Sequence, residues 1–283
     1  MVIKIENILN NINHIEYIDN KKIGIKLISK LESTEGNTIS WCNEKNLHKI
    51  NFVSNKTIIV PPAIKYTNIL STNKRNNYII SDNPRGFFTK LLDLIYPEEI
   101  IMGVVKGNNV TIGDNVTIGD NVKIGHNTVI LDNTVIGDNV NIGCNNTIGG
   151  VGFGYEKDEN GDYVLIKHIG NVIIHNNVDI GNNVCIDRAV LGSTIIGNNV
   201  KIDNLVHIAH GVKIGENSLI IANSMIAGST NIGKNVWIAP STSIINKVNI
   251  GDNSMTGIGT VAITNIEHNE LHVGVPNKKI KNI

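Results

Sequence analysis

The chain has 283 residues, enough for one large domain or two smaller ones, and its 25 basic and 25 acidic residues give a formal net charge of zero. This balance gives no electrostatic support for a general role in binding nucleic acid or a membrane surface. Residues 1–20 contain no uninterrupted apolar stretch, so they predict neither a signal peptide nor a membrane span. Three widely spaced cysteines without zinc-site spacing indicate reduced thiols in a cytoplasmic protein.

Residues 1–100 predict a small α/β domain. Short strands are expected at "NTISWC" (37–42), "KTIIVPP" (56–62) and "NYIIS" (77–81). The segment "NPRGFFTKLLDLIYP" (83–97) predicts one helix, with Asn83 as its N-cap and Pro97 at its end. The helix has one apolar face, formed by Phe87, Phe88, Leu91, Leu92 and Ile95.

A six-residue period dominates residues 101–263. Isoleucine recurs every six positions from Ile112 to Ile148, returns at Ile174, and continues from Ile196 to Ile250 after a slip of four residues across "RAVLGST". Such a period fits neither an α-helix nor a β-hairpin. It predicts a solenoid in which each hexad forms a short strand and a tight turn, and three hexads form a coil of about 18 residues. The "GDN" and "GNN" triplets supply the positive-φ positions of these turns.

One insertion interrupts the repeat, at residues 150–169, within "GGVGFGYEKDENGDYVLIKHIG". It predicts a loop that leaves the coil, and such insertions often collect on a functional face. Phe153, Tyr155 and Tyr163 would allow the loop to cover a ligand; a loop that packs only on its own or a neighbouring subunit is the alternative. Residues 264–283 are expected to form a C-terminal coil and tail.

The hexads resemble those of the hexapeptide-repeat proteins, which implies a left-handed parallel β-helix; the handedness comes from this resemblance alone. Hexad helices also occur as inert scaffolds and as ice-binding proteins. An ice-binding face would require a regular Thr-x-Thr ladder, and the sequence contains none.

The order of the parts carries a more specific resemblance. The α/β segment, the hexads, "GVGFGY" with its loop and "CIDRAVLGSTIIGNNVKIDNLVHIAHGVKIG" follow one another. In this order they resemble the UDP-3-O-(3-hydroxyacyl)glucosamine N-acyltransferases and relatives that N-acylate nucleotide-linked amino sugars. The resemblance extends from about residue 20 to 265 and implies an enzyme, an acyltransferase that uses a thioester donor.

The resemblance implies roles for particular residues. The histidine of "IAH", His210, would be the general base, and Asp203 and Asn204 would lie along the sugar-binding cleft. Trp41 would stack on the nucleotide base, with Asn43 and Lys45 nearby. A second stacking tyrosine is not evident, since Asn46 stands about where it is expected.

N-acylation requires a base for the amine proton and donors for the thioester oxyanion. We expect Asp203 to hold the His210 imidazole and a backbone N–H near Gly228 to receive the oxyanion. His207 would bind substrate or cap a turn. Lys278 and Lys279 would meet the phosphates of coenzyme A, unless they belong to a solvated tail.

The chain end departs from the lipid A family. In place of a long helical tail that engages acyl carrier protein, it ends in "GVPNKKI", similar to acetyl-CoA-dependent sugar acetyltransferases. We therefore expect acetyl transfer from acetyl-CoA to the amine of a nucleotide-activated amino sugar, for a surface glycan. The alternative is the lipid A step itself, with an acyl carrier protein donor. O-acetylation would use the same residues.

Two further alternatives belong to other classes. A zinc enzyme that hydrates carbon dioxide would require three histidines from neighbouring coils, two of them with a five-residue spacing. No histidine pair in the sequence has this five-residue spacing, so no metal is expected. A structural or carbohydrate-binding solenoid would release no thiol from an acyl thioester. The family further implies a cytoplasmic homotrimer with its sites in the grooves between β-helices.

Overall fold

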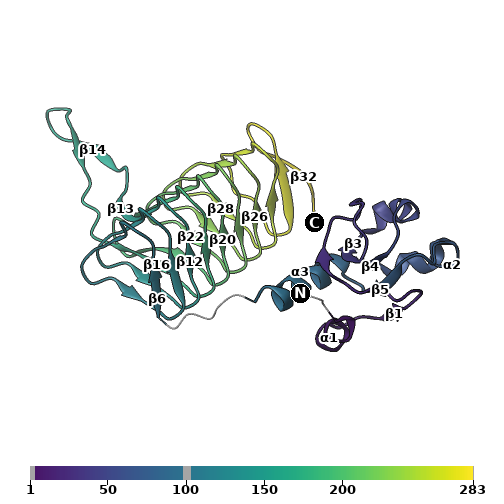
Figure 1. The fold of residues 1–283 in the computed structure, drawn as a ribbon. Coiled ribbons are helices and arrows are strands. Elements are labelled where there is room, and N and C mark those ends of the chain that lie inside the picture. Colours follow the sequence, from purple (N-terminus) through teal and green to yellow (C-terminus); the bar gives the residue numbers. More distant parts are fainter. Residues whose placement is uncertain (1–3, 98–102, 283) are drawn as a thin grey trace. The chain divides into compact units, whose positions relative to one another are not determined.

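The computed structural model describes residues 4–97 and 103–282. The chain divides into two compact units, Met1–Glu99 and Ile100–Ile283 (Figure 1). Within the described ranges, no helix combines the length and the apolar character needed to cross a membrane.

The first unit is a five-stranded sheet with short helices, in the strand order β1-β5-β4-β3-β2. Strand β1 runs antiparallel to β5, and the other neighbours are parallel. Its elements are α1 (Ile5–Asn11), β1 (Glu16–Ile18), β2 (Leu27–Ile28), β3 (Thr38–Trp41), η1 (Glu44–Phe52), β4 (Lys56–Val60), η2 (Pro62–Tyr66), α2 (Ile69–Thr72), β5 (Asn77–Ile80) and α3 (Pro84–Ile95).

The three predicted strands and the predicted helix of this unit are confirmed as β3, β4, β5 and α3. Asn83 caps α3, because its side chain accepts a hydrogen bond from the Gly86 N–H at 2.9 Å. Phe87 and Leu91 of the apolar face are buried against the sheet, in a cluster with Ile39, Ile59 and Ile79. Elements α1, β1 and β2 were not predicted, because they are short and carry little periodic pattern.

The second unit is a parallel β-helix with three sheets (Figure 1). The first sheet contains β7 (Thr111–Ile112), β10 (Val129–Ile130), β13 (Thr147–Val151), β18 (Cys185–Arg188), β21 (His207–Ile208), β24 (Met225–Ile226), β27 (Ser243–Ile244) and β30 (Val261–Ala262). The second contains β8 (Thr117–Ile118), β11 (Val135–Ile136), β16 (Asn171–Ile174), β19 (Ser193–Ile196), β22 (Lys213–Ile214), β25 (Asn231–Ile232) and β28 (Asn249–Ile250). The third contains β6 (Val104–Lys106), β9 (Val122–Ile124), β12 (Asn141–Ile142), β17 (Asp179–Ile180), β20 (Lys201–Ile202), β23 (Leu219–Ile220), β26 (Trp237–Ile238), β29 (Met255–Thr256), β31 (Glu270–Val273) and β32 (Lys278–Asn282).

The register confirms a coil of 18 residues. Ile130 pairs with Ile148, and Ile208 pairs with Ile226. Across the insertion Ile148 instead pairs with Ile186, and across the slip Ile174 pairs with Ile196. The repeat therefore absorbs both irregularities as surface excursions and keeps isoleucine above isoleucine.

The stacked isoleucines form one continuous core, in which Ile130, Ile148, Ile186 and Ile208 are fully buried. At the corners most residues with positive φ are asparagines, as the triplets predicted. Their side chains form ladders from coil to coil; Asn121, for example, donates to Asn139 at 2.9 Å. The corners are thus stabilised by side-chain amides and the interior by apolar burial.

The insertion leaves the coil as a hairpin of β14 (Tyr155–Lys157) and β15 (Tyr163–Leu165), which projects from the β-helix in Figure 1. The C-terminal segment extends the third sheet. Strand β31 pairs with β29 in parallel, and β32 folds back antiparallel on β31.

Leu205 provides a test of the corner chemistry. It is 58% exposed and takes a φ of 61°, a conformation that other corners give to asparagine. Leu205→Asn should stabilise the protein by about 1 kcal/mol, because the left-handed conformation is costly for a leucine. The melting temperature measures this. Leu191→Asn is the matched control, since Leu191 is 74% exposed without a positive φ. An equal gain in both variants would contradict the argument.

Candidate functional site around His210

A hollow of about 540 Å³ lies on the β-helix around His210, two residues after β21. Its lining includes Phe153, Asp187, His207 and Gly228. Residues 18 apart stack on neighbouring coils, so Gly228 follows His210 on the next coil. The repeat thus brings to one place groups that are far apart in the sequence.

The His210 ring lies directly over Gly228. A Cβ added at Gly228 would come within 2.7 Å of the Cε1 and Nε2 atoms of His210. Any other residue here would therefore displace the ring. The expected proximity of Gly228 to His210 is present in the structure.

His207 lies in the same hollow, held by a carboxylate. Strands β18 and β21 are neighbours, and the His207 Nε2 lies 3.1 Å from the Asp187 Oδ2. The Asp187 side chain is only 15% exposed, whereas that of His207 is 45% exposed. The hydrogen bond to Asp187 raises the pKa of His207, although burial opposes it. His207 therefore keeps its proton to a higher pH than an isolated histidine does.

His210 has the opposite bias. Burial lowers its pKa, the charge of His168 lowers it further, and Asp187 acts weakly in the other direction. The hollow thus contains one imidazole that releases its proton easily and one that retains it. Paired groups whose pKa values are driven apart are typical of acid–base chemistry.

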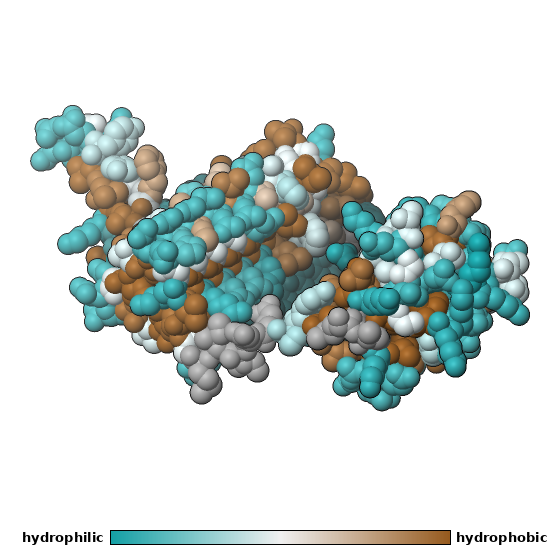
Figure 2. Space-filling model, viewed as in Figure 1, coloured by the Kyte–Doolittle hydropathy of each residue, from teal (hydrophilic) through white to brown (hydrophobic). Residues whose placement is uncertain are grey.

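The hairpin contributes an aromatic wall. Phe153 is 85% exposed, lines the hollow and contacts Tyr155 with ring centroids 5.0 Å apart. Tyr155 itself does not line the hollow; it reaches the site through Phe153. Figure 2 shows the hairpin tip as hydrophilic and its stem as hydrophobic.

The structure does not bring Asp203 and Asn204 to His210. The Oδ1 of Asp203 accepts from the backbone and side-chain N–H groups of Asn204, and its Oδ2 accepts from Ala222. The Oδ1 of Asn204 accepts from Asn182 in a corner ladder. A position seven residues before His210 lies at a different corner of the coil, so within one chain Asp203 does not hold this imidazole.

Sequence reasoning missed Asp187 and His168. The adjacent Arg188 does not pair with Asp187; it donates to the carbonyl oxygens of Gly149 and Asp132. The slip of four residues hid the contact between Asp187 and His207. His168 lies in the non-repeating insertion, where no period could place it.

Among the described residues no group of three His, Cys, Asp or Glu side chains could hold a metal ion.

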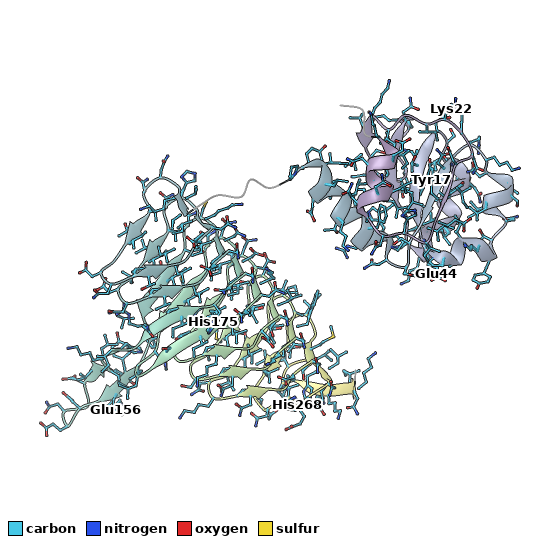
Figure 3. All side chains as sticks on the ribbon, turned by 90° about the horizontal axis from the view of Figure 1, so that it is seen from below. Tyr17, Lys22, Glu44, Glu156, His175 and His268 are labelled. Atoms are coloured by element: carbon cyan, nitrogen blue, oxygen red, sulfur yellow. The ribbon has the colours of Figure 1, made fainter. Side chains whose placement is uncertain are left out.

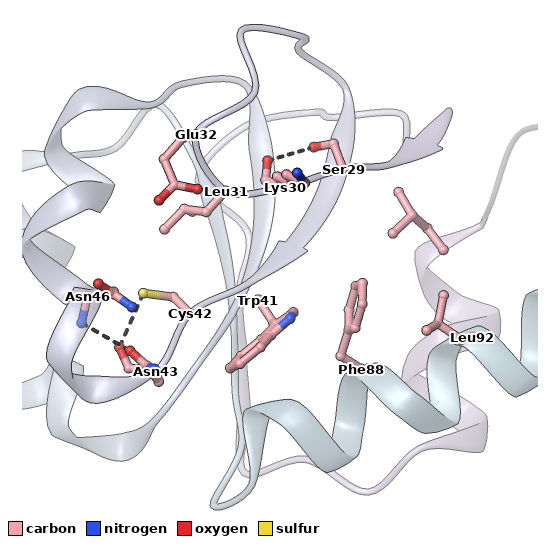
Figure 4. A pocket seen from close by; sticks show the side chains of 11 residues that line it. Ser29, Lys30, Leu31, Glu32, Trp41, Cys42, Asn43, Asn46, Phe88 and Leu92 are labelled. Atoms are coloured by element: carbon pink, nitrogen blue, oxygen red, sulfur yellow. Dashed lines mark hydrogen bonds between the residues drawn. The ribbon is translucent and has the colours of Figure 1, made fainter. Parts of the chain in front are cut away.

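A second hollow, of about 480 Å³, lies in the first unit (Figure 4). Trp41, Asn43 and Asn46 line it, and Lys45 does not. The Trp41 ring faces Phe88 of α3, with centroids 6.4 Å apart. The Asn43 side chain caps η1 by accepting from the Asn46 N–H at 3.1 Å. Phe88, which was assigned only to the helix core, is the aromatic neighbour that the sequence did not reveal.

The two candidate donor-binding lysines lie on β32. Lys279 forms an ion pair with Glu270, and Lys278 pairs through its backbone with Val273. Lys279, followed by His272, lowers the pKa of Glu270 to about 2. Lys279 thus has a partner within the chain.

Comparison with known proteins agrees with this fold. The bacterial transferase hexapeptide (six repeats) matches residues 100–132, 115–150 and 193–228. The chain is 49% identical over 81 residues to a UDP-3-O-acylglucosamine N-acyltransferase of Cytophaga hutchinsonii, covering 29% of this chain and 23% of that protein. For UDP-3-O-acylglucosamine N-acyltransferase 2 of Legionella pneumophila the identity is 51% over 80 residues, covering 28% and 23%. The matches thus span about a quarter of the length of these relatives.

Two solved structures share the fold. A UDP-N-acetylglucosamine acyltransferase aligns with a TM-score of 0.52 and 20% identity, over 64% of this chain and 72% of that one. The Francisella novicida UDP-N-acetylglucosamine acyltransferase aligns with a TM-score of 0.50 and 23% identity, over 65% and 68%. The fold class, a left-handed parallel β-helix preceded by a small α/β domain, is confirmed, as is the resemblance to hexapeptide-repeat sugar N-acyltransferases.

Asp187→Asn tests the electrostatics of the hollow. His207 should then titrate at lower pH, and His210 should move the same way by less, in an NMR titration of the imidazole C–H signals. Because the pKa of His207 in the fold lies above its unfolded value, this pair stabilises the fold at low pH. That contribution disappears as the pH rises through the folded pKa. The difference in melting temperature between variant and wild type should therefore become smaller as the pH rises. An unchanged His207 titration in the variant would contradict the pairing of His207 with Asp187.

Proposed function

We propose that the chain is an N-acyltransferase that moves an acyl group from a thioester to the amine of a nucleotide-linked amino sugar. The observation that carries this proposal is the pair of imidazoles with opposed pKa shifts in one hollow, with His210 over Gly228. Support comes from the names of the relatives, which are N-acyltransferases.

In the proposed reaction the neutral amine attacks the thioester carbonyl carbon, and His210 accepts the proton that the nitrogen loses. A histidine with a pKa below the ordinary value of about 6.5 is mostly neutral at neutral pH, so one ring nitrogen can accept the proton. The backbone near Gly228 supplies donors for the oxyanion. The carbon–sulfur bond then breaks, and His207, whose pKa Asp187 raises, gives its proton to the leaving thiolate.

The names of the relatives favour UDP-3-O-acylglucosamine as the acceptor. This corresponds to the lipid A step, with an acyl carrier protein thioester as donor. No finding supports acetyl-CoA over that donor, so acetyl transfer becomes the second candidate. Its support is the sequence "GVPNKKI" near the chain end. In either form the product would enter a surface glycan or lipopolysaccharide.

The hollow of the first unit would receive the nucleotide. Trp41 and Phe88 offer aromatic faces for a base, and polar groups of Asn43 and Asn46 lie on the same wall. The proposal also includes a cytoplasmic homotrimer, with a mass in solution three times the 30.8 kDa of one chain. Met225, Ile245 and Ile263 give the His210 hollow an exposed apolar rim that a neighbouring subunit could cover.

Trp41→Ala should weaken binding of the sugar nucleotide by roughly 5- to 150-fold, the range of about 1–3 kcal/mol for one stacked base, and leave donor affinity unchanged. Isothermal titration calorimetry with UDP, the sugar nucleotide and each donor measures this. The control is Tyr66→Ala, which removes a 93% exposed aromatic outside the hollow. Equal losses for donor and nucleotide, or none, would remove the assignment of Trp41.

His210→Ala should lower the turnover number about 10²–10⁴-fold, because the amine proton loses its acceptor. Release of free thiol is measured with acetyl-CoA and with 3-hydroxyacyl carrier protein, each against UDP-3-O-acylglucosamine and UDP- and dTDP-linked amino sugars. His175→Ala, at an exposed histidine of the same unit (Figure 3), is the control. Turnover that survives in His210→Ala would mean a different base. If the wild type releases no thiol with any pair of donor and acceptor, the proposed function is contradicted.

A further inference from the structure

A second imidazole lies beside His210, and the reaction proposed above does not use it. His168 follows strand β15 of the hairpin and is only 6% exposed. Its ring meets that of His210 edge to face, with centroids 5.2 Å apart. His207, the other imidazole that lines the hollow with His210, is held by Asp187.

The tautomer of His168 follows from its one hydrogen bond. The Nδ1 lies 2.6 Å from the Ile166 carbonyl oxygen, so the Nδ1 carries the proton and donates. The Nε2 is then an acceptor, and it is buried without a hydrogen-bond partner. A buried unsatisfied acceptor destabilises a fold, whereas an apolar side chain would fill this space without that cost. Packing alone therefore does not account for a histidine here.

The same ring lies against a tight turn. The Gly154 N–H donates to the Gly152 carbonyl oxygen at 3.2 Å, which places Phe153 at the apex of the turn. A Cβ at Gly152 would come within 2.8 Å of the His168 Nε2 and 2.9 Å of the His210 Cβ. A Cβ at Gly154 would lie 3.3 Å from the His168 Cε1. The two glycines let His168 lie against the turn backbone on one side and His210 on the other.

We propose that His168 is a positioning residue that locks the Gly152–Phe153–Gly154 turn against His210 and so fixes the aromatic wall of the hollow. The turn, the base and the apolar wall then move as one unit. The proposal rests on the proposed function only in treating His210 as the base. Among the charged groups around the hollow, His168 lowers the pKa of His210 and Asp187 raises it. His207 and Lys247 line the same hollow.

The test uses the full chain and needs no substrate. With 4-fluorophenylalanine incorporated, the chain gives four ¹⁹F signals, and Phe153→Leu identifies one of them. His168→Gln should shift or broaden the Phe153 signal and leave that of buried Phe87 unchanged. In the same variant the His210 C–H signals should titrate at higher pH than in the wild type. His175→Gln, at an exposed histidine, should change neither.

A second variant covers a failure of His168→Gln to fold. Gly154→Ala keeps the imidazole but displaces it slightly, since the new methyl would lie 3.3 Å from its Cε1, and it should perturb the Phe153 signal in the same sense. With an active enzyme, either variant should raise the KM of the acceptor more than it lowers the turnover number, with a total loss of up to about 100-fold. A folded His168→Gln protein with a wild-type Phe153 signal and an unmoved His210 titration would overturn the proposal. That result would leave the acyl-transfer proposal intact.

Discussion

The stacking of isoleucine on isoleucine at intervals of one coil is the constraint on which the second unit depends. Each hexad places one isoleucine inward, and the coil above repeats the placement, so the core is a continuous column of fully buried side chains. Because every coil has the same interior, the chain can leave or slip only at the surface. It does so twice, and after each excursion isoleucine again pairs with isoleucine.

The same constraint builds the candidate site. A solenoid turns sequence distance into spatial proximity at a fixed interval, so a residue on one coil acts with residues one or two coils away. His210 lies over Gly228 for this reason. The insertion adds what the repeat cannot supply, an aromatic side chain and a third histidine brought back from a projecting hairpin. The coils position His210, and the insertion provides the wall around it.

The sequence predicted most where a period or a local rule applied. The hexads predicted the coil, the triplets predicted the left-handed corners, and Asn83 with its proline predicted the start of α3. The contacts of the site followed no such rule. Counting 18 residues back from His207 leads to Ala189, whereas the slip pairs His207 with Cys185 and brings Asp187 to its ring. The repeat likewise did not show that Asp203 lies at another corner of the coil than His210. There its carboxylate accepts hydrogen bonds from Asn204 and Ala222. Side-chain partners across an irregular register depend on the fold as a whole, so one sequence does not reveal them.

The opposed histidines follow from where the coil places each ring. His207 belongs to a strand, next to a strand that ends in a carboxylate, and its charge is therefore stabilised. His210 lies past the strand end, under the insertion and beside another imidazole, where a charge is disfavoured. Three residues of sequence thus separate two electrostatic environments, because His207 lies in a two-residue strand and His210 in the turn that follows it. A helix would have placed the same two side chains on one face, with similar surroundings. The short strand and sharp corner of the hexad therefore allow a segment as brief as "HIAH" to place two histidines where the pKa of one is raised and that of the other is lowered.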